Sequence, residues 1–194
     1  MRNIVVFLLI QVSLACFAQF GVGMRDTRYV NVGYTFKNRM GVEFEHSVFS
    51  EKFKYQHVRL SLSYTMPVNS FEFQVKPYFG TLYCGDYYDV GAFMNARYHV
   101  VRPLTLCGTL NPHYDSGFEY KTCFMLGAEC NVYKDLSLVA QYTTIPENRQ
   151  SEKRVRAGMK FDIGQLWVEP LVSIPVEGRS HKSVRLAVSM GYQF

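Results

Sequence analysis

Residues 184–194 read VRLAVSMGYQF and alternate between apolar side chains and polar or small ones. Successive side chains of a β-strand point to opposite faces, so this segment predicts a strand with one continuous apolar face. Whether that face meets a protein core or lipid decides the fold. The apolar series occupies every second position and reaches the last residue: Val184, Leu186, Val188, Met190, Tyr192 and Phe194.

The same period of two runs through most of the chain upstream. In residues 40–48, for example, Val42 and Phe44 alternate with Glu43 and Glu45. The pattern predicts twelve strands, an even number as in bacterial single-chain barrels, with ten or fourteen as alternatives. The predicted strands are 19–25, 29–37, 40–48, 57–66, 71–79, 88–99, 104–112, 118–133, 136–145, 155–163, 166–174 and 184–194.

The connections between these strands fall into two alternating sets. Short connections are expected at a periplasmic rim and longer, more polar ones outside the cell. Gly164-Gln165 suits a two-residue hairpin with glycine first. The short set is 37–39, 67–70, 101–103, 134–135 and 164–165; the long set is 49–55, 84–87, 112–117, 146–153 and 175–182.

The first 18 residues predict a secretory signal peptide, cleaved after Ala18, so that residues 19–194 form one domain. The alternative is that Cys16 is lipidated. After the signal, no apolar run approaches the ~20 residues of a membrane-spanning helix. A chain without such a helix crosses a bilayer only as a closed barrel. The aromatic content of 15%, with 14 Tyr and 15 Phe, suits two girdles at membrane surfaces.

A soluble β-sandwich shows the same alternation with the faces reversed, so the C-terminal tail is informative. The tail, with Tyr192 and the terminal Phe194, resembles the closing strand of Gram-negative outer-membrane β-barrel proteins. The resemblance implies a transmembrane antiparallel up-and-down β-barrel in the outer membrane. Tyr192 and Phe194 would then act as the assembly signal. The implied partners are outer-membrane lipid, lipopolysaccharide and the barrel-assembly machinery. The net charge of +5 is mild and dispersed, which argues against nucleic acid.

The polar faces of the strands would line the lumen and bring charges together. A hairpin centred on Lys52 puts Glu45 opposite Arg59, and the Gly164-Gln165 turn puts Lys160 opposite Glu169. We expect both as lumenal ion pairs, because buried charges need partners. The candidate pore-lining residues are Arg154, Arg156, Lys160, Arg185, Arg59, Glu43, Glu45 and Glu169.

Within this set, Arg154, Arg156 and Lys160 form a basic stripe on one strand, and Arg185 adds a cation on the last strand. In a water-filled lumen these cations would favour small anions, as rings of charged side chains do in pores. The leading hypothesis is therefore a small passive diffusion channel for hydrophilic solutes with weak anion preference. The alternatives are a closed barrel with a structural or surface-interaction role and, more remotely, a lipid-processing enzyme.

The sequence offers little support for enzyme chemistry or a bound cofactor. His46 is placed on the lipid side, but Ser47 beside it points inward, and no Cys/His spacing resembles a zinc site. A hairpin centred on Asp115 would set Cys107 opposite Cys123, so a disulfide between these two is one alternative, whereas Cys84 and Cys130 are expected to be free thiols. We therefore predict no catalytic residue, no metal and no cofactor.

Overall fold

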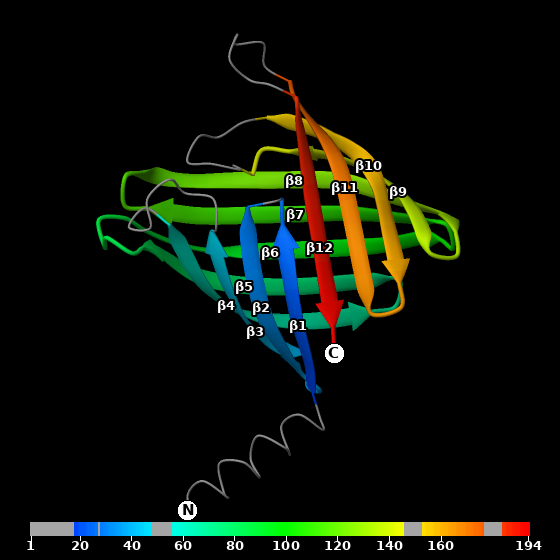
Figure 1. Cartoon of the computed structure of the whole chain (residues 1–194), viewed down its shortest axis with the longest axis horizontal. Helices are drawn as coiled ribbons and strands as arrows, with labels where there is room; N and C mark the ends of the chain where they lie inside the picture. Colours follow the sequence, from blue (N-terminus) through cyan, green and yellow to red (C-terminus); the bar gives the residue numbers. More distant parts are fainter. Residues whose placement is uncertain (1–17, 27, 48–55, 146–152, 177–183) are drawn as a thin grey trace, which may run out of the picture.

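The computed structural model describes residues 18–26, 28–47, 56–145, 153–176 and 184–194, which form an all-β barrel (Figure 1). No helix in these ranges is long and apolar enough to cross a membrane. The strands are β1 (Ala18–Arg25), β2 (Tyr29–Phe36), β3 (Met40–Ser47), β4 (His57–Val68), β5 (Phe71–Leu82), β6 (Tyr88–Val101), β7 (Leu104–Asp115), β8 (Phe118–Tyr133), β9 (Leu136–Thr143), β10 (Arg154–Ile163), β11 (Leu166–Pro175) and β12 (Arg185–Gln193).

Each strand pairs antiparallel with the next along the chain, and β1 pairs with β12 to close the barrel. The closing seam joins Gly21 to Gln193 and Met24 to Met190. Beyond the seam, the amide of Phe194 donates to the Phe20 carbonyl at 2.8 Å. Closure gives the edge strands partners, as a chain in lipid requires. The predicted twelve-strand, up-and-down barrel is confirmed.

The two faces of the sheet are oriented as a membrane barrel requires. Leu60 and Leu186, on the outer face, are 53% and 66% exposed, whereas Glu45, on the inner face, is 6% exposed. Apolar side chains cover the outside of the barrel, and charged ones contact each other inside it. This arrangement excludes the soluble sandwich, whose apolar faces would pack together.

Aromatic side chains lie on the outer face near both ends of the barrel. Phe71 and Tyr98 stack with ring centroids 4.3 Å apart where β5 begins and β6 nears its end. Tyr88 and Tyr114 contact at 6.3 Å toward the opposite end. Two such girdles match the two water interfaces of a bilayer.

The short connections lie at the predicted turns, although two are shorter than predicted because β4 extends to Val68 and β6 to Val101. The two-residue turn Gly164-Gln165 has a positive φ of 63° at its glycine. The predicted long connection 112–117 is wrong. β7 continues to Asp115 and β8 begins at Phe118, because Asp115 pairs with Asp89 and its Oδ1 accepts from the Gly117 amide at 2.8 Å. Residues 1–17, which hold most of the expected signal peptide and Cys16, lie outside the described residues, as do 48–55, 146–152 and 177–183.

We call the end of the barrel with the longer connections the loop rim, and the opposite end the turn rim. β1, β3 and β5 end at the loop rim, and β4 and β6 begin there. The strands differ in length: β1, β2 and β3 have 8 residues each, whereas β8 has 16. The strands β4–β8 are therefore longer than β1–β3 (Figure 1).

Candidate functional site in the lumen

A single cross-strand row places the main charged groups of the lumen side by side. Glu45 of β3 pairs in register with Arg59 of β4, Arg59 with Gly80 of β5, and Gly80 with Asp89 of β6. These residues share the inward face, because positions directly opposite in an antiparallel ladder point the same way. The row lies near the loop rim.

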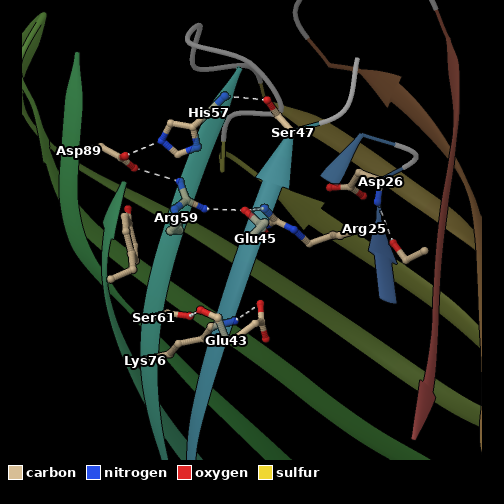
Figure 2. A network of polar contacts seen from close by, with 12 residues as sticks. Arg25, Asp26, Glu43, Glu45, Ser47, His57, Arg59, Ser61, Lys76 and Asp89 are labelled. Atoms are coloured by element: carbon tan, nitrogen blue, oxygen red, sulfur yellow. Dashed lines mark hydrogen bonds and ion pairs between the residues drawn. The ribbon is translucent and has the colours of Figure 1, made fainter. Parts of the chain in front are cut away.

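Ion pairs connect this row into a chain (Figure 2). Arg25 and Arg59 both donate to Oε1 of Glu45, at 2.9 and 3.2 Å. The other Arg59 nitrogen, Nη2, donates to Oδ2 of Asp89 at 2.9 Å. His57 Nε2 lies 2.7 Å from the second oxygen of Asp89. Each carboxylate thus contacts two basic side chains.

Asp26 extends the chain across the closing seam. It follows Arg25 directly, adopts a positive φ of 53°, and accepts from Arg156 Nη1 of β10 at 3.2 Å. Its backbone amide donates to Ser189 Oγ of β12 at 3.1 Å. We call the whole set the loop-rim belt; it runs along the wall from β10 through β1, β3 and β4 to β6. Its members are Arg25, Asp26, Glu45, His57, Arg59, Asp89 and Arg156.

Around Glu45 and Asp89, the belt covers the carboxylates more than the cations. The side chains of Glu45 and Asp89 are 8% and 5% exposed, whereas that of Arg25 is 38% exposed. Arg59 contacts both Glu45 and Asp89, and its guanidinium carbon also lies 4.3 Å from the ring centroid of Tyr78. Such contacts stabilise a partly desolvated cation. The surface that this part of the belt offers to the lumen is therefore mainly guanidinium.

A second group of charges lies deeper, toward the turn rim. Lys76 donates to Glu43 at 2.7 Å, and Arg97 donates to Glu129 at 2.9 Å. Here both signs reach the lumen, because the side chains of Arg97 and Asp162 are 40% and 48% exposed. The turn-rim half is more accessible to water than the belt and has no dominant sign.

The hairpin registers predict one ion pair correctly and one wrongly. Glu45 and Arg59 form the expected pair. Lys160 does not pair with Glu169; its ammonium lies 3.6 Å from Glu129 and 3.1 Å from Asp162. The reason is the small Ser137, which stands opposite Lys160 on β9 and lets the long lysine reach across to β8.

The predicted juxtaposition of Cys107 and Cys123 is also wrong. The β7–β8 hairpin turns two residues later than expected, so Cys107 pairs with Gly127 and Cys123 with Asn111. All four described cysteines are free thiols, including Cys84 and Cys130.

The basic stripe is less accessible than the sequence suggests. Arg154 is fully buried, and its Nε and Nη2 donate to the hydroxyl and carbonyl oxygens of Ser173 at 2.7 and 2.9 Å. Arg154 therefore cannot contact a solute, and its predicted role as a pore-lining residue is wrong. Arg156 is drawn to Asp26 and its side chain is 11% exposed. Arg185 lies on the inward face opposite Ser173, and Glu169 opposite Ser189.

The sequence prediction of the site leaves out Arg25, Asp26, His57 and Asp89. The alternation places Arg25 and Asp89 inside, but counting about the predicted connection 84–87 aligns Asp89 with Leu82, whereas the structure pairs it with Gly80. Asp26 carries no such signal, since it lies in a turn between two strands.

The described residues contain no group of three or more His, Cys, Asp or Glu side chains arranged to hold a metal ion. On the outer wall, His46 lies near the ring of Tyr83, at a centroid distance of 5.7 Å. Ser47 is occupied on the inner side, where its Oγ accepts from the backbone amide of His57 at 2.8 Å. The two side chains therefore point to opposite faces of β3.

No family model matches the chain, and no curated protein matches it by sequence. Several solved barrels match it in structure. A KdgM porin in complex with disordered oligogalacturonate has a TM-score of 0.68 at 12% identity, over 91% of this chain and 98% of the other. A NanC porin has a TM-score of 0.58 at 8% identity, over 91% and 98%. The Acinetobacter baumannii outer membrane protein Omp33 has a TM-score of 0.54 at 9% identity, over 91% and 96%. At these identities the likeness establishes the fold.

Proposed function

We propose that the chain is a small passive diffusion channel for small hydrophilic solutes with a weak preference for anions. It would act without enzymatic chemistry in the outer membrane of a Gram-negative bacterium. The observation that carries this proposal is the uneven exposure within the loop-rim belt. The Arg25 side chain is 38% exposed, while that of Glu45, whose carboxylate it contacts, is 8% exposed.

The size of the barrel is consistent with a narrow channel. Eight strands give a lumen that side chains fill, and sixteen or more leave a wide aqueous pore. Twelve strands lie between these limits. The exposed Arg97 and Asp162 support a water-filled lumen on the turn-rim side.

The expected preference is weak because the lumenal charges are closely balanced. One exposed unit charge about 7 Å from an ion in water contributes ~0.6 kcal/mol, or about threefold in the permeability of that ion. Arg25 could supply a bias of that order. One structural neighbour supports the same solute class: the KdgM porin was solved with an oligogalacturonate, and galacturonate carries a negatively charged carboxylate.

The remaining parts of the proposal concern export and orientation. Residues 1–18 would direct secretion, the turn rim would face the periplasm, and the loop rim would face lipopolysaccharide. The C-terminal strand, which ends in Tyr192 and Phe194 beside Phe20, would be presented to the barrel-assembly machinery.

A closed barrel with a structural or surface-interaction role is the second candidate, and one observation favours it. Arg154 and Ser173 are 0% exposed and Leu171 is 2% exposed, so the inner face of the β10–β11 wall is tightly packed. The two candidates differ in whether an ion can pass.

Planar-bilayer recording of the refolded, purified barrel tests the proposal. The expected result is single-channel conductance, with a reversal potential in a KCl gradient that shows modest chloride preference. Reconstituted barrel that is folded but does not conduct would favour the closed barrel. A clear preference for potassium would contradict the anion assignment.

A further inference from the structure

Gly80 stands at the centre of the charged row and contributes no side chain to it. It pairs with Arg59 on one side and with Asp89 on the other. Arg59 and Asp89 nevertheless bond each other at 2.9 Å, across the full width of β5. Because Gly80 has no side chain, the Arg59 and Asp89 side chains can contact each other in the space above it.

The imidazole of His57 uses the same space. A β-carbon placed on Gly80 would collide with Oδ1 of Asp89 and would lie 2.5 Å from Nε2 and 2.7 Å from Cε1 of His57. These are the two groups of the 2.7 Å His57–Asp89 contact. The His57–Asp89 pair (Figure 2) therefore fills the space that a side chain at Gly80 would occupy.

We propose that Gly80 is a positioning residue that sets the ion selectivity and the bore of the channel at the loop rim. It does so by holding the His57–Asp89 pair against the wall. This inference rests on the proposed channel function and identifies which residue keeps an acid out of the permeation path.

The consequence of filling the gap follows from the geometry. The colliding atoms are the ends of side chains, so they can move, and the backbone of β5 blocks movement in the outward direction. The Asp89 carboxylate, which is 5% exposed, must swing into the lumen and lose its contact with His57. A carboxylate there attracts cations and narrows the path, whereas in its present place Arg59 and His57 cover it.

The test replaces Gly80 by alanine and records conductance and reversal potential in planar bilayers. In Gly80→Ala the chloride-to-potassium permeability ratio should fall about sevenfold, because one unit charge ~7 Å from an ion in water changes the permeability of each ion about threefold, in opposite directions. Single-channel conductance should also fall. The matched control is Gly33→Ala on β2, which shares the inward face with Glu43 and where an added β-carbon meets the Val42 carbonyl oxygen at 3.6 Å and the Glu43 Cγ and Cβ at 3.7 and 3.8 Å, all ordinary contacts. It should keep the wild-type values.

A second background separates positioning from general damage to the fold. In a His57→Ala/Asp89→Ala protein the colliding atoms are gone, so adding Gly80→Ala should change neither selectivity nor conductance. If Gly80→Ala does not assemble in the wild-type background, it should assemble in this one. An assembled Gly80→Ala channel with wild-type selectivity overturns the inference, and so does an equal effect of the substitution in both backgrounds. A wild-type barrel that does not conduct refutes the channel function itself, which is a different outcome.

Discussion

Replacement of Glu45 by glutamine removes the carboxylate that both Arg25 and Arg59 contact, while keeping the size of the side chain and one acceptor oxygen. Two guanidinium groups then lose an anionic partner in a region where the acid side chain is 8% exposed. Breaking a fully buried ion pair from one side costs about 3–5 kcal/mol.

The expected cost here is lower, for two structural reasons. Arg25 is 38% exposed, so water screens much of its lost interaction, and Arg59 retains Asp89 at 2.9 Å. We therefore expect Glu45→Gln to lower the free energy of unfolding by about 1–2 kcal/mol. With a urea dependence of ~2 kcal/mol per molar, the unfolding midpoint should fall by roughly 0.5–1 M.

The assay is urea unfolding of the barrel in lipid vesicles, followed by fluorescence of the chain's single tryptophan. Trp167 faces the lumen and lies over Gly191, where an added β-carbon would be 2.6 Å from the indole nitrogen. Its emission should therefore report loss of the closed barrel. The matched control is Glu72→Gln on β5, a lumenal glutamate for which the described residues show no ion pair; it should shift the midpoint by less than about 0.3 M. Equal midpoints for Glu45→Gln and wild type would refute the view that the belt carries stability.

Three further outcomes are expected. Arg25→Gln should reduce the chloride-to-potassium permeability ratio about sevenfold in the reversal-potential assay, since it removes the most exposed cation of the belt and each ion shifts about threefold in opposite directions. An unchanged ratio would remove Arg25 as the source of selectivity. Asp26→Asn keeps a residue that tolerates the positive φ but weakens the contact with Arg156, so the free energy of unfolding should fall by roughly 1 kcal/mol. On heating before gel electrophoresis, the band of the folded barrel should shift to the unfolded position at a lower temperature than in wild type; an unchanged temperature contradicts this. Cys130, exposed on the outer face, should react in vesicles with a membrane-soluble maleimide faster than the buried Cys123, and mild oxidation should not join Cys107 to Cys123; mass spectrometry of the folded protein checks both.

The period of two predicts the fold well because lipid and lumen impose opposite demands on alternate residues along a strand. That rule places Glu45 and Arg59 inside, and the symmetry of a hairpin about its centre places them opposite each other. The same reasoning fails at Cys107 and Cys123, because it needs the position of the turn. Asp115 looks like a loop residue, but pairs with Asp89 and extends β7.

The alternation of polar and apolar residues predicts neither the position of a turn nor how deeply an inward side chain is buried. Arg154 and Arg25 have the same polarity and the same inward direction, yet Arg154 is fully covered and Arg25 is 38% exposed. The difference comes from the neighbours: Ser173 accepts two bonds from Arg154 at the wall, while Arg25 lies at the end of the short strand β1. Such depths depend on which side chains of other strands lie beside each residue, and a single sequence does not reveal them.

The position of the belt also bears on how the barrel closes. The β1–β12 seam has four register pairs, against eleven between β5 and β6, so it is the shorter and weaker ladder. Asp26 binds both Ser189 on β12 and Arg156 on β10, and therefore ties the end of β1 to the far side of the seam. The acids of the belt thus neutralise lumenal arginines and also hold the short strands together. It follows that a change at Glu45 or Asp26 must alter stability together with selectivity. Arg25, whose guanidinium is the exposed end of the chain, is where selectivity can change at least cost to closure.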